Sequence, residues 1–143
     1  MIYKIRPRNF NPKFEVASCF IEFQKEILLL HRQDHKPQGN TWGIPAGKKD
    51  EGENILETII REVKEETQIE LNPSETKYFG KFYVKYPDFD FIYHMFSVEL
   101  NYKPKVQLRN EEHKNKSWLP PEKALELNLI EGLEENIKTF YNL

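Results

Sequence analysis

The sequence predicts an α/β fold in which a mixed β-sheet is flanked by helices. Two observations support this expectation. Segments typical of strands come first, one amphipathic helical segment interrupts them, and further strands and two terminal helices follow. This order places helices on both faces of a sheet. The length of 143 residues suits a single domain, residues 1–143, that buries about two thirds of the surface of its unfolded chain.

Composition limits the partners and surroundings that suit the chain. The formal net charge of -2 gives no basic excess, so we expect no stable nucleic-acid partner. The one cysteine, Cys19, excludes an intramolecular disulfide and lies in an apolar run, which predicts a buried thiol in a reducing compartment. The sequence has no signal-peptide core and no membrane span, so we expect a cytoplasmic protein. Its oligomeric state, monomer or homodimer, stays open.

Three strand-like segments precede the helical segment. The first is Ile2–Ile5, and the second, Phe14–Phe23, is rich in aromatic and β-branched residues. A three-residue polar turn leads into Ile27–Leu30, which predicts an antiparallel hairpin. A polar loop over residues 34–40 and an extended piece, Thr41–Gly47, then lead towards the helix.

The helix is predicted over Ile55–Thr67. Asn54 and Glu57 have the spacing of a capping box, and the segment contains neither Pro nor Gly. At about 100° per residue, one arc should face the core. Glu57 and Arg61 are spaced for an ion pair on the opposite, solvated face. The residues of the core-facing arc are Leu56, Ile59, Ile60, Val63 and Thr67.

Further strands and two helices follow this segment. Alternating aromatic residues predict strands at Tyr78–Tyr86 and Phe89–Leu100, and a short strand is expected at Val106–Leu108. A polar loop should continue to Trp118 and Leu119. Two helices should close the chain, because proline suits a first helical turn and an apolar stripe follows. They are expected from Pro120 or Pro121 to Leu127 and over Glu131–Tyr141.

Aromatic side chains gather in the two strands after the helix. Tyr86, Phe89, Phe91 and Tyr93 either fill the core or form a floor on which a nucleobase stacks. The sequence does not choose among these residues. We take Tyr86, Phe89 and Phe91 as the candidate substrate-binding set.

Glu62, Glu65 and Glu66 form a third arc of the predicted helix, beside the apolar one. Like charges at this spacing repel one another, and beside the core they also lose solvent. Oxygen ligation of a hard divalent cation reverses this cost. A solvated acidic face is the alternative, and these three residues alone do not exclude it.

The segment Gly47–Ile69 carries a longer pattern, G-x5-E-x7-R-E-U-x-E-E-x-G-U, where U is a bulky aliphatic residue. This pattern resembles the signature of the Nudix hydrolases. Six fixed identities at set spacing arise by chance on the order of 10⁻⁷ times per start position. The matching residues are Gly47, Glu53, Arg61, Glu62, Val63, Glu65, Glu66 and Ile69.

Gln68 departs from the signature, which has a glycine at this place. Glycine would let the helix end through a left-handed residue, and a non-glycine adopts that conformation at a cost of roughly 1 kcal/mol or more. We therefore expect the helix to end by another route.

The resemblance implies an α/β/α sandwich and a site for Mg²⁺ or Mn²⁺. It implies that the carbonyl before the first signature glycine, that of Ala46, binds metal. It also implies one more glutamate from the segment before Trp118, which is Glu112, with Glu111 as the alternative. The implied metal ligands are Ala46, Glu62, Glu65, Glu66 and Glu112.

Other roles are implied in the same way. Glu62 or Glu112 would act as the base that activates water. Glu53 would pair with or orient Arg61, and Arg61 would hold the site together without touching substrate. Arg32, a cation after an aliphatic strand, either approaches a substrate phosphate or is plain surface charge.

The implied function is that of a metal-dependent pyrophosphohydrolase. Its small-molecule substrate would be a nucleoside diphosphate linked to another group, for example a nucleoside triphosphate cleaved to the monophosphate and pyrophosphate. Two alternatives remain, a hydrolase of nucleoside-diphosphate sugars and a catalytically inactive module that binds or senses a nucleotide. The complete carboxylate set favours an enzyme, because binding alone does not need every carboxylate.

Overall fold

A computed structural model describes residues 1–143. Its order of strands, one central helix, further strands and terminal helices confirms the predicted order. The strands are β1 (Ile2–Tyr3), β2 (Pro12–Phe23), β3 (Glu26–Arg32), β4 (Trp42–Gly43), β5 (Ala46–Lys48), β6 (Lys77–Lys85), β7 (Asp90–Leu100) and β8 (His113–Leu119). The helices are α1 (Ile55–Thr67), α2 (Pro121–Ala124) and α3 (Leu133–Tyr141), with a 3₁₀ turn at Pro73–Glu75.

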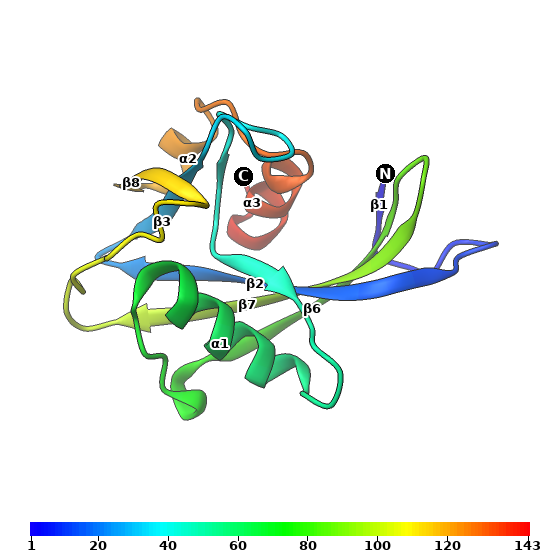
Figure 1. The fold of residues 1–143 in the computed structure, drawn as a ribbon, viewed down its shortest axis with the longest axis horizontal. Helices are drawn as coiled ribbons and strands as arrows, with labels where there is room; N and C mark the ends of the chain where they lie inside the picture. Colours follow the sequence, from blue (N-terminus) through cyan, green and yellow to red (C-terminus); the bar gives the residue numbers. More distant parts are fainter.

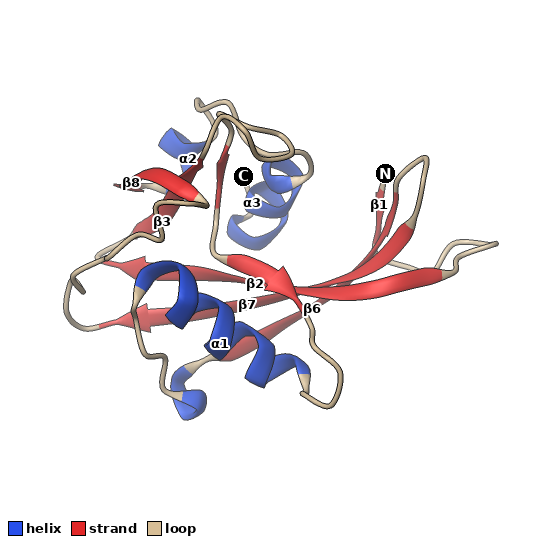
Figure 2. Cartoon of the chain, in the orientation of Figure 1, coloured by secondary structure: helices blue, strands red, loops and turns tan.

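The strands form a mixed sheet in the order β1-β6-β7-β2-β3-β4, with β5 on β2 and β8 on β3 (Figure 2). The central pair, β2 and β7, is parallel, whereas β6 is antiparallel to β7. β2 and β3 pair only at their hairpin, where Glu22 and Phe23 face Ile27 and Glu26. Further along, β2 pairs with β5 while β3 pairs with β4 and β8. The sheet therefore divides beyond the hairpin.

Helices cover both faces of this sheet. α1 packs on one face, and α2 and α3 pack on the other (Figure 1). Neighbouring residues of β2 point to opposite faces, so that Cys19 joins the core under α1 and Phe20 joins the core under α3. Strands covered on both faces need apolar residues at successive positions. This accounts for the continuous apolar runs, and the burial of Cys19 confirms the predicted buried thiol.

The helix α1 has the predicted bounds and the predicted capping box. The Asn54 side chain accepts from the Glu57 backbone N–H at 2.9 Å, and the Glu57 side chain accepts from the Asn54 N–H at 2.8 Å. The prediction that the C-terminal end of α1 avoids a left-handed residue was wrong. Gln68 adopts the left-handed conformation with φ 64°, and its N–H donates to the Lys64 carbonyl. The cap keeps its geometry without the glycine, at a cost in backbone strain.

Two predictions for the segment before α2 were wrong. Val106–Leu108 forms no strand, although the Gln107 N–H donates to the Thr67 carbonyl at 3.0 Å. The predicted polar loop is instead strand β8 from His113 onwards. Pairing with β3 decides this, because a neighbouring strand supplies hydrogen bonds even to a polar sequence. Of the remaining elements, β1, α2 and α3 are shorter than predicted.

None of the helices has the length and apolar character needed to cross a lipid bilayer. The longest helix, α1, has 13 residues.

Candidate active site

The loop between β5 and α1 folds tightly because it is tied to the helix. Glu53 accepts hydrogen bonds from the Asp50 backbone N–H and the Thr58 hydroxyl, both at 2.8 Å. Gly47 lies directly against the carboxyl group of Glu62, and a Cβ atom on Gly47 would overlap that carboxyl group. A larger residue at this position would therefore displace the Glu62 carboxyl group from its place between the loop and Arg61.

Arg61 ties this loop to the acidic side of α1. Its guanidinium donates to Glu53 at 2.7 Å, to Glu62 at 2.8 Å and to the Lys48 carbonyl at 2.9 Å. The hydrogen bond from Arg61 lowers the pKa of Glu53 to about 2. The predicted pair of Arg61 with Glu57 was wrong, because Glu57 caps the helix and Arg61 turns towards the loop.

Glu66 is the most deeply buried carboxylate of the signature, with 5% of its surface exposed. Its Oε2 atom is fully buried and has no hydrogen-bond partner. Burial, followed by the nearby charge of Glu62, raises the pKa of Glu66 well above its ordinary value. Burial also raises the pKa of Glu62, against the hydrogen bond from Arg61. Two acidic groups with raised pKa values thus face each other beneath the loop.

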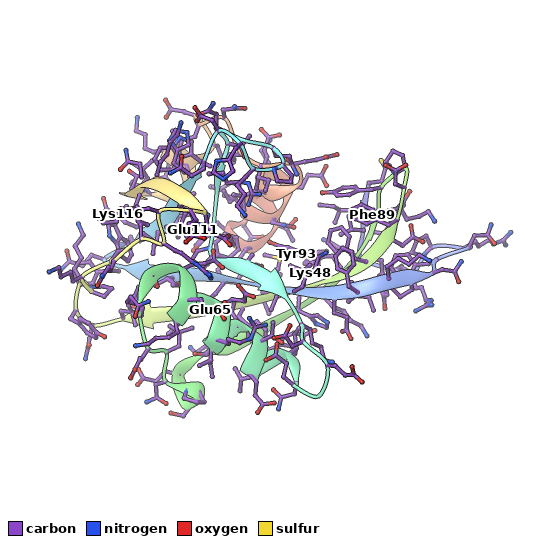
Figure 3. The ribbon with its side chains drawn as sticks, in the orientation of Figure 1. Lys48, Glu65, Phe89, Tyr93, Glu111 and Lys116 are labelled. Atoms are coloured by element: carbon purple, nitrogen blue, oxygen red, sulfur yellow. The ribbon has the colours of Figure 1, made fainter.

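The other predicted metal ligands lie at different places around this pair. The Ala46 backbone lies against the Glu66 carboxyl group, and the charge of Glu112 also reaches Glu66. Glu65 stands apart on α1, 3.4 Å from Arg61 (Figure 3). Glu111 is exposed in the segment before β8, so the structure favours Glu112 of the two alternatives.

A cavity of about 330 Å³ connects the acidic group to the aromatic strands. Its acidic end is formed by Ala46, Glu66 and Glu112, with Arg32 in the same wall. Its other end is lined by Tyr86, Phe89, Phe91 and Tyr93, together with residues of β1 and the start of α3. The structure thus brings the predicted substrate-binding residues and part of the predicted metal set to one cavity. Glu53, Arg61, Glu62 and Glu65 do not line it.

The aromatic end is an ordered cluster. Phe91 stacks on Phe14 with ring centres 5.2 Å apart, and Tyr86 meets Phe91 edge to face at 5.4 Å. Phe89 lies on the turn between β6 and β7 (Figure 3), 5.5 Å from Phe14. The ammonium group of Lys48 lies 4.2 Å above the Phe14 ring and lines the cavity. Flat apolar surfaces of this kind accept a planar ring.

Comparison with known proteins identifies the family. The family model described as "NUDIX domain" matches residues 12–141 of this chain. The chain belongs to the Nudix family. The resemblance inferred from Gly47–Ile69 is thereby confirmed, and the Nudix match covers both ends of the cavity.

Relatives and solved structures agree with this membership. The chain is 35% identical over 72 residues to the 8-oxo-dGDP phosphatase of Mus musculus, covering 50% of this chain and 22% of that protein. It is 27% identical over 117 residues to the CTP pyrophosphohydrolase of Escherichia coli, covering 80% and 82% of the two chains. The crystal structure of the MutT protein from Methanosarcina mazei superposes with a TM-score of 0.78 at 26% identity, covering 92% and 94%. This likeness confirms the predicted α/β fold.

The Nudix carboxylates fit a hard divalent cation in their chemistry. Glu62, Glu66 and Glu112 offer oxygen ligands, the kind that Mg²⁺ and Mn²⁺ prefer. Glu66 has an oxygen without a partner, and the pKa values of Glu62 and Glu66 are raised. A positive charge between these carboxylates would supply the missing partner and stabilise both as anions. As the side chains stand, no three His, Cys, Asp or Glu residues converge to hold an ion.

Several residues that line the cavity were not predicted as site residues, among them Phe14, Asn136 and His113. Phe14 was taken only as the start of a strand. Asn136, 4% exposed, occupies a polar position on the core-facing side of α3, three residues after Leu133, and this exception in an apolar stripe was a readable signal. His113, also 4% exposed, follows Glu112 directly. Burial lowers the pKa of His113 to about 4, so its ring is neutral at physiological pH.

Proposed function

We propose that this chain hydrolyses a phosphoric anhydride bond in a nucleoside diphosphate linked to another group, with a nucleoside triphosphate cleaved to the monophosphate and pyrophosphate as the leading case. One observation carries the proposal. A single cavity has carboxylates at one end and stacked aromatic rings at the other. A phosphate chain and a nucleobase match these two ends in charge and shape.

The names of relatives support the same class. Two relatives are named for hydrolysis of nucleoside phosphates, 8-oxo-dGDP and CTP. The chain spans only 22% of the mouse and 19% of the human 8-oxo-dGDP phosphatase, so their activity does not transfer as a whole. The CTP pyrophosphohydrolase, of which the chain covers 82%, supports a single domain over residues 1–143.

Mg²⁺ or Mn²⁺ would be held by Glu62, Glu65, Glu66, Glu112 and the Ala46 carbonyl. The ion would neutralise phosphate charge and polarise the bond that breaks. Arg61 keeps Glu62 and the signature loop in place through its hydrogen bonds to Glu53, Glu62 and the Lys48 carbonyl, which fits a supporting role.

The general base is Glu62 or Glu112. Glu62 already accepts the Arg61 hydrogen bond at 2.8 Å, which occupies part of its acceptor capacity, and it does not line the cavity. Glu112 has a looser partner, Lys36 at 3.8 Å, and lines the cavity. This makes Glu112 the stronger candidate to take the proton of the attacking water. Arg32, in the same wall, would bind charge on the phosphate chain.

The test is product release over a panel of nucleoside triphosphates, nucleoside-diphosphate sugars and dinucleoside polyphosphates with Mg²⁺. We expect turnover of at least one triphosphate and a loss of 100-fold or more in kcat for Glu62→Gln or Glu112→Gln, a range typical of base or metal-ligand loss. Glu51→Gln, an exposed glutamate of the loop between β5 and α1, is the matched control.

The panel also separates the alternatives. Turnover confined to nucleoside-diphosphate sugars would change the substrate class and keep the reaction type. Tight nucleotide binding with no turnover of any compound would refute the hydrolase and leave a binding module.

A further inference from the structure

His113 is a buried residue that the proposed reaction leaves unused. It lines the cavity with only 4% of its surface exposed. Its Nδ1 atom is fully buried and has no hydrogen-bond partner. Nε2 has no partner within the protein either, but it is not fully buried. Nε2 is therefore the ring nitrogen that reaches the cavity.

The position of the ring proton follows from this difference. A neutral imidazole carries one N–H, on Nδ1 or on Nε2. Nδ1 lacks a partner in either form, but a buried N–H without an acceptor is rarer in native structures than a buried acceptor without a donor, which favours the proton on Nε2. A proton on Nε2 places the donor at the cavity surface, where solvent or a ligand can accept it. His113 thus offers an N–H donor at Nε2 to whatever fills this end of the cavity.

Arg32 supplies a second donor beside it. Arg32 and His113 are cross-strand partners in the pairing of β3 with β8. The Arg32 Nε donates to the Pro37 carbonyl at 2.9 Å, and its terminal N–H groups bind no acceptor of the protein. Both residues line the acidic end of the cavity, next to Glu66 and Glu112. Two outward donors side by side match an acceptor with several oxygens.

We propose that His113 donates a hydrogen bond from Nε2 to an oxygen of the substrate's phosphate chain and, with Arg32, positions that chain against the acidic group. The nature of the ligand rests on the proposed function, whereas the donor itself rests on the cavity geometry. The segment that carries it runs between Glu111 and Lys116, both labelled in Figure 3.

Three substitutions distinguish this role from a structural one. In His113→Gln the side-chain amide extends towards the place of Nε2, in His113→Asn it reaches only that of Nδ1, and His113→Phe keeps the ring shape without a donor. We expect KM for the best triphosphate to rise at least about tenfold in the Phe and Asn variants, as for loss of a hydrogen bond to a charged group. The Gln variant should stay within about threefold, with kcat less affected in all three.

A second measurement does not depend on turnover. The Kd of inorganic pyrophosphate, measured by calorimetry with Mg²⁺, should follow the same order, with wild type and Gln tight and with Asn and Phe weak. His35→Gln, an exposed histidine outside the cavity, is the control for a general loss of histidine. Should the Phe variant fail to fold, the Gln and Asn variants decide by themselves.

The two proposals fail separately. Suppose that the wild type cleaves none of the compounds, while the affinity for pyrophosphate follows the predicted order among the variants. The hydrolase proposal then fails and the role of His113 stands. If Asn restores binding and Gln does not, if all three variants bind like the wild type, or if the wild type binds no pyrophosphate, the role of His113 is refuted.

Discussion

At the scale of single residues, the site contrasts a satisfied carboxylate with an unsatisfied one. Glu53 accepts from Arg61, Thr58 and the loop backbone, and its pKa falls to about 2. Glu66, on the same helix face as Glu62, has one oxygen without a partner and a raised pKa. The first residue stabilises the fold as an anion, whereas the second destabilises it when ionised.

Glu66→Gln should therefore change the pH dependence of stability in the absence of metal. Because the folded pKa of Glu66 lies above its ordinary value of 4.5, its favourable contribution is complete below that value and is lost as pH rises towards the folded pKa. Gln cannot ionise, so the free energy of unfolding of the variant should exceed that of the wild type by about 1 to 3 kcal/mol at pH 8 and by little at pH 4. Urea unfolding in EDTA at the two pH values measures this.

Two controls test the interpretation of the Glu66→Gln measurement. Glu135→Gln, an exposed glutamate of α3, should leave the pH profile unchanged. Added Mg²⁺ should stabilise the wild type more than Glu66→Gln, because the proposed ligand is missing. Equal pH profiles for the wild type and Glu66→Gln would show that Glu66 is not strained in the fold.

At the scale of elements, α1 is determined by local signals at its start and strained at its end. The capping box begins the helix, and its apolar arc packs against β2 and the strands beside it. Gln68 ends it with φ 64°. The helix tolerates this non-glycine because the backbone bond to Lys64 keeps the last turn closed.

Gln68→Gly should raise the free energy of unfolding by about 0.5 to 1 kcal/mol, since relief of the left-handed strain outweighs the added freedom of the unfolded chain. Denaturant unfolding measures the difference. Gln107→Gly is the matched control, because Gln107 is exposed and has no positive φ, and it should destabilise the protein. A destabilised Gln68→Gly would mean that the Gln68 side chain contributes more than its backbone costs.

At the scale of the whole molecule, the divided sheet creates the cavity. β2 and β3 separate away from their hairpin, and residues in and next to β2, β6 and β7 form the aromatic end of the cavity. The acidic end is formed by Glu66 of α1 and Glu112 before β8, together with the ends of β3 and β5. Residues far apart in the chain, such as Phe14 and Asn136, meet in its wall. Substrate selection is therefore a property of the assembled fold.

Phe89→Ala should weaken substrate binding through this cavity. Loss of one aromatic stacking surface is expected to raise KM roughly tenfold, within the range measured for bases on aromatic side chains, with a smaller change in kcat. Tyr102→Ala removes an aromatic ring that is 55% exposed and outside the cavity, and should leave KM unchanged. Steady-state kinetics on the best substrate measures both. An unchanged KM in Phe89→Ala would place the base elsewhere.

The sequence by itself determined the order of the elements, the bounds of α1 and the family. These features rest on short-range signals, such as the Asn54–Glu57 box, the spacing from Gly47 to Glu66, and apolar periods of two and of about 3.6 residues. Such signals do not depend on contacts with residues distant in the chain, which is why the predicted fold class was confirmed.

Only the tertiary structure decided which side chains meet. Arg61 binds Glu53 and not Glu57. A polar segment forms β8 because it pairs with β3. Phe14 and His113 line the cavity. Each outcome depends on partners distant in the chain. The physical reason is that strand pairing and burial are set by the neighbours that the fold supplies, and no local period in the sequence encodes them.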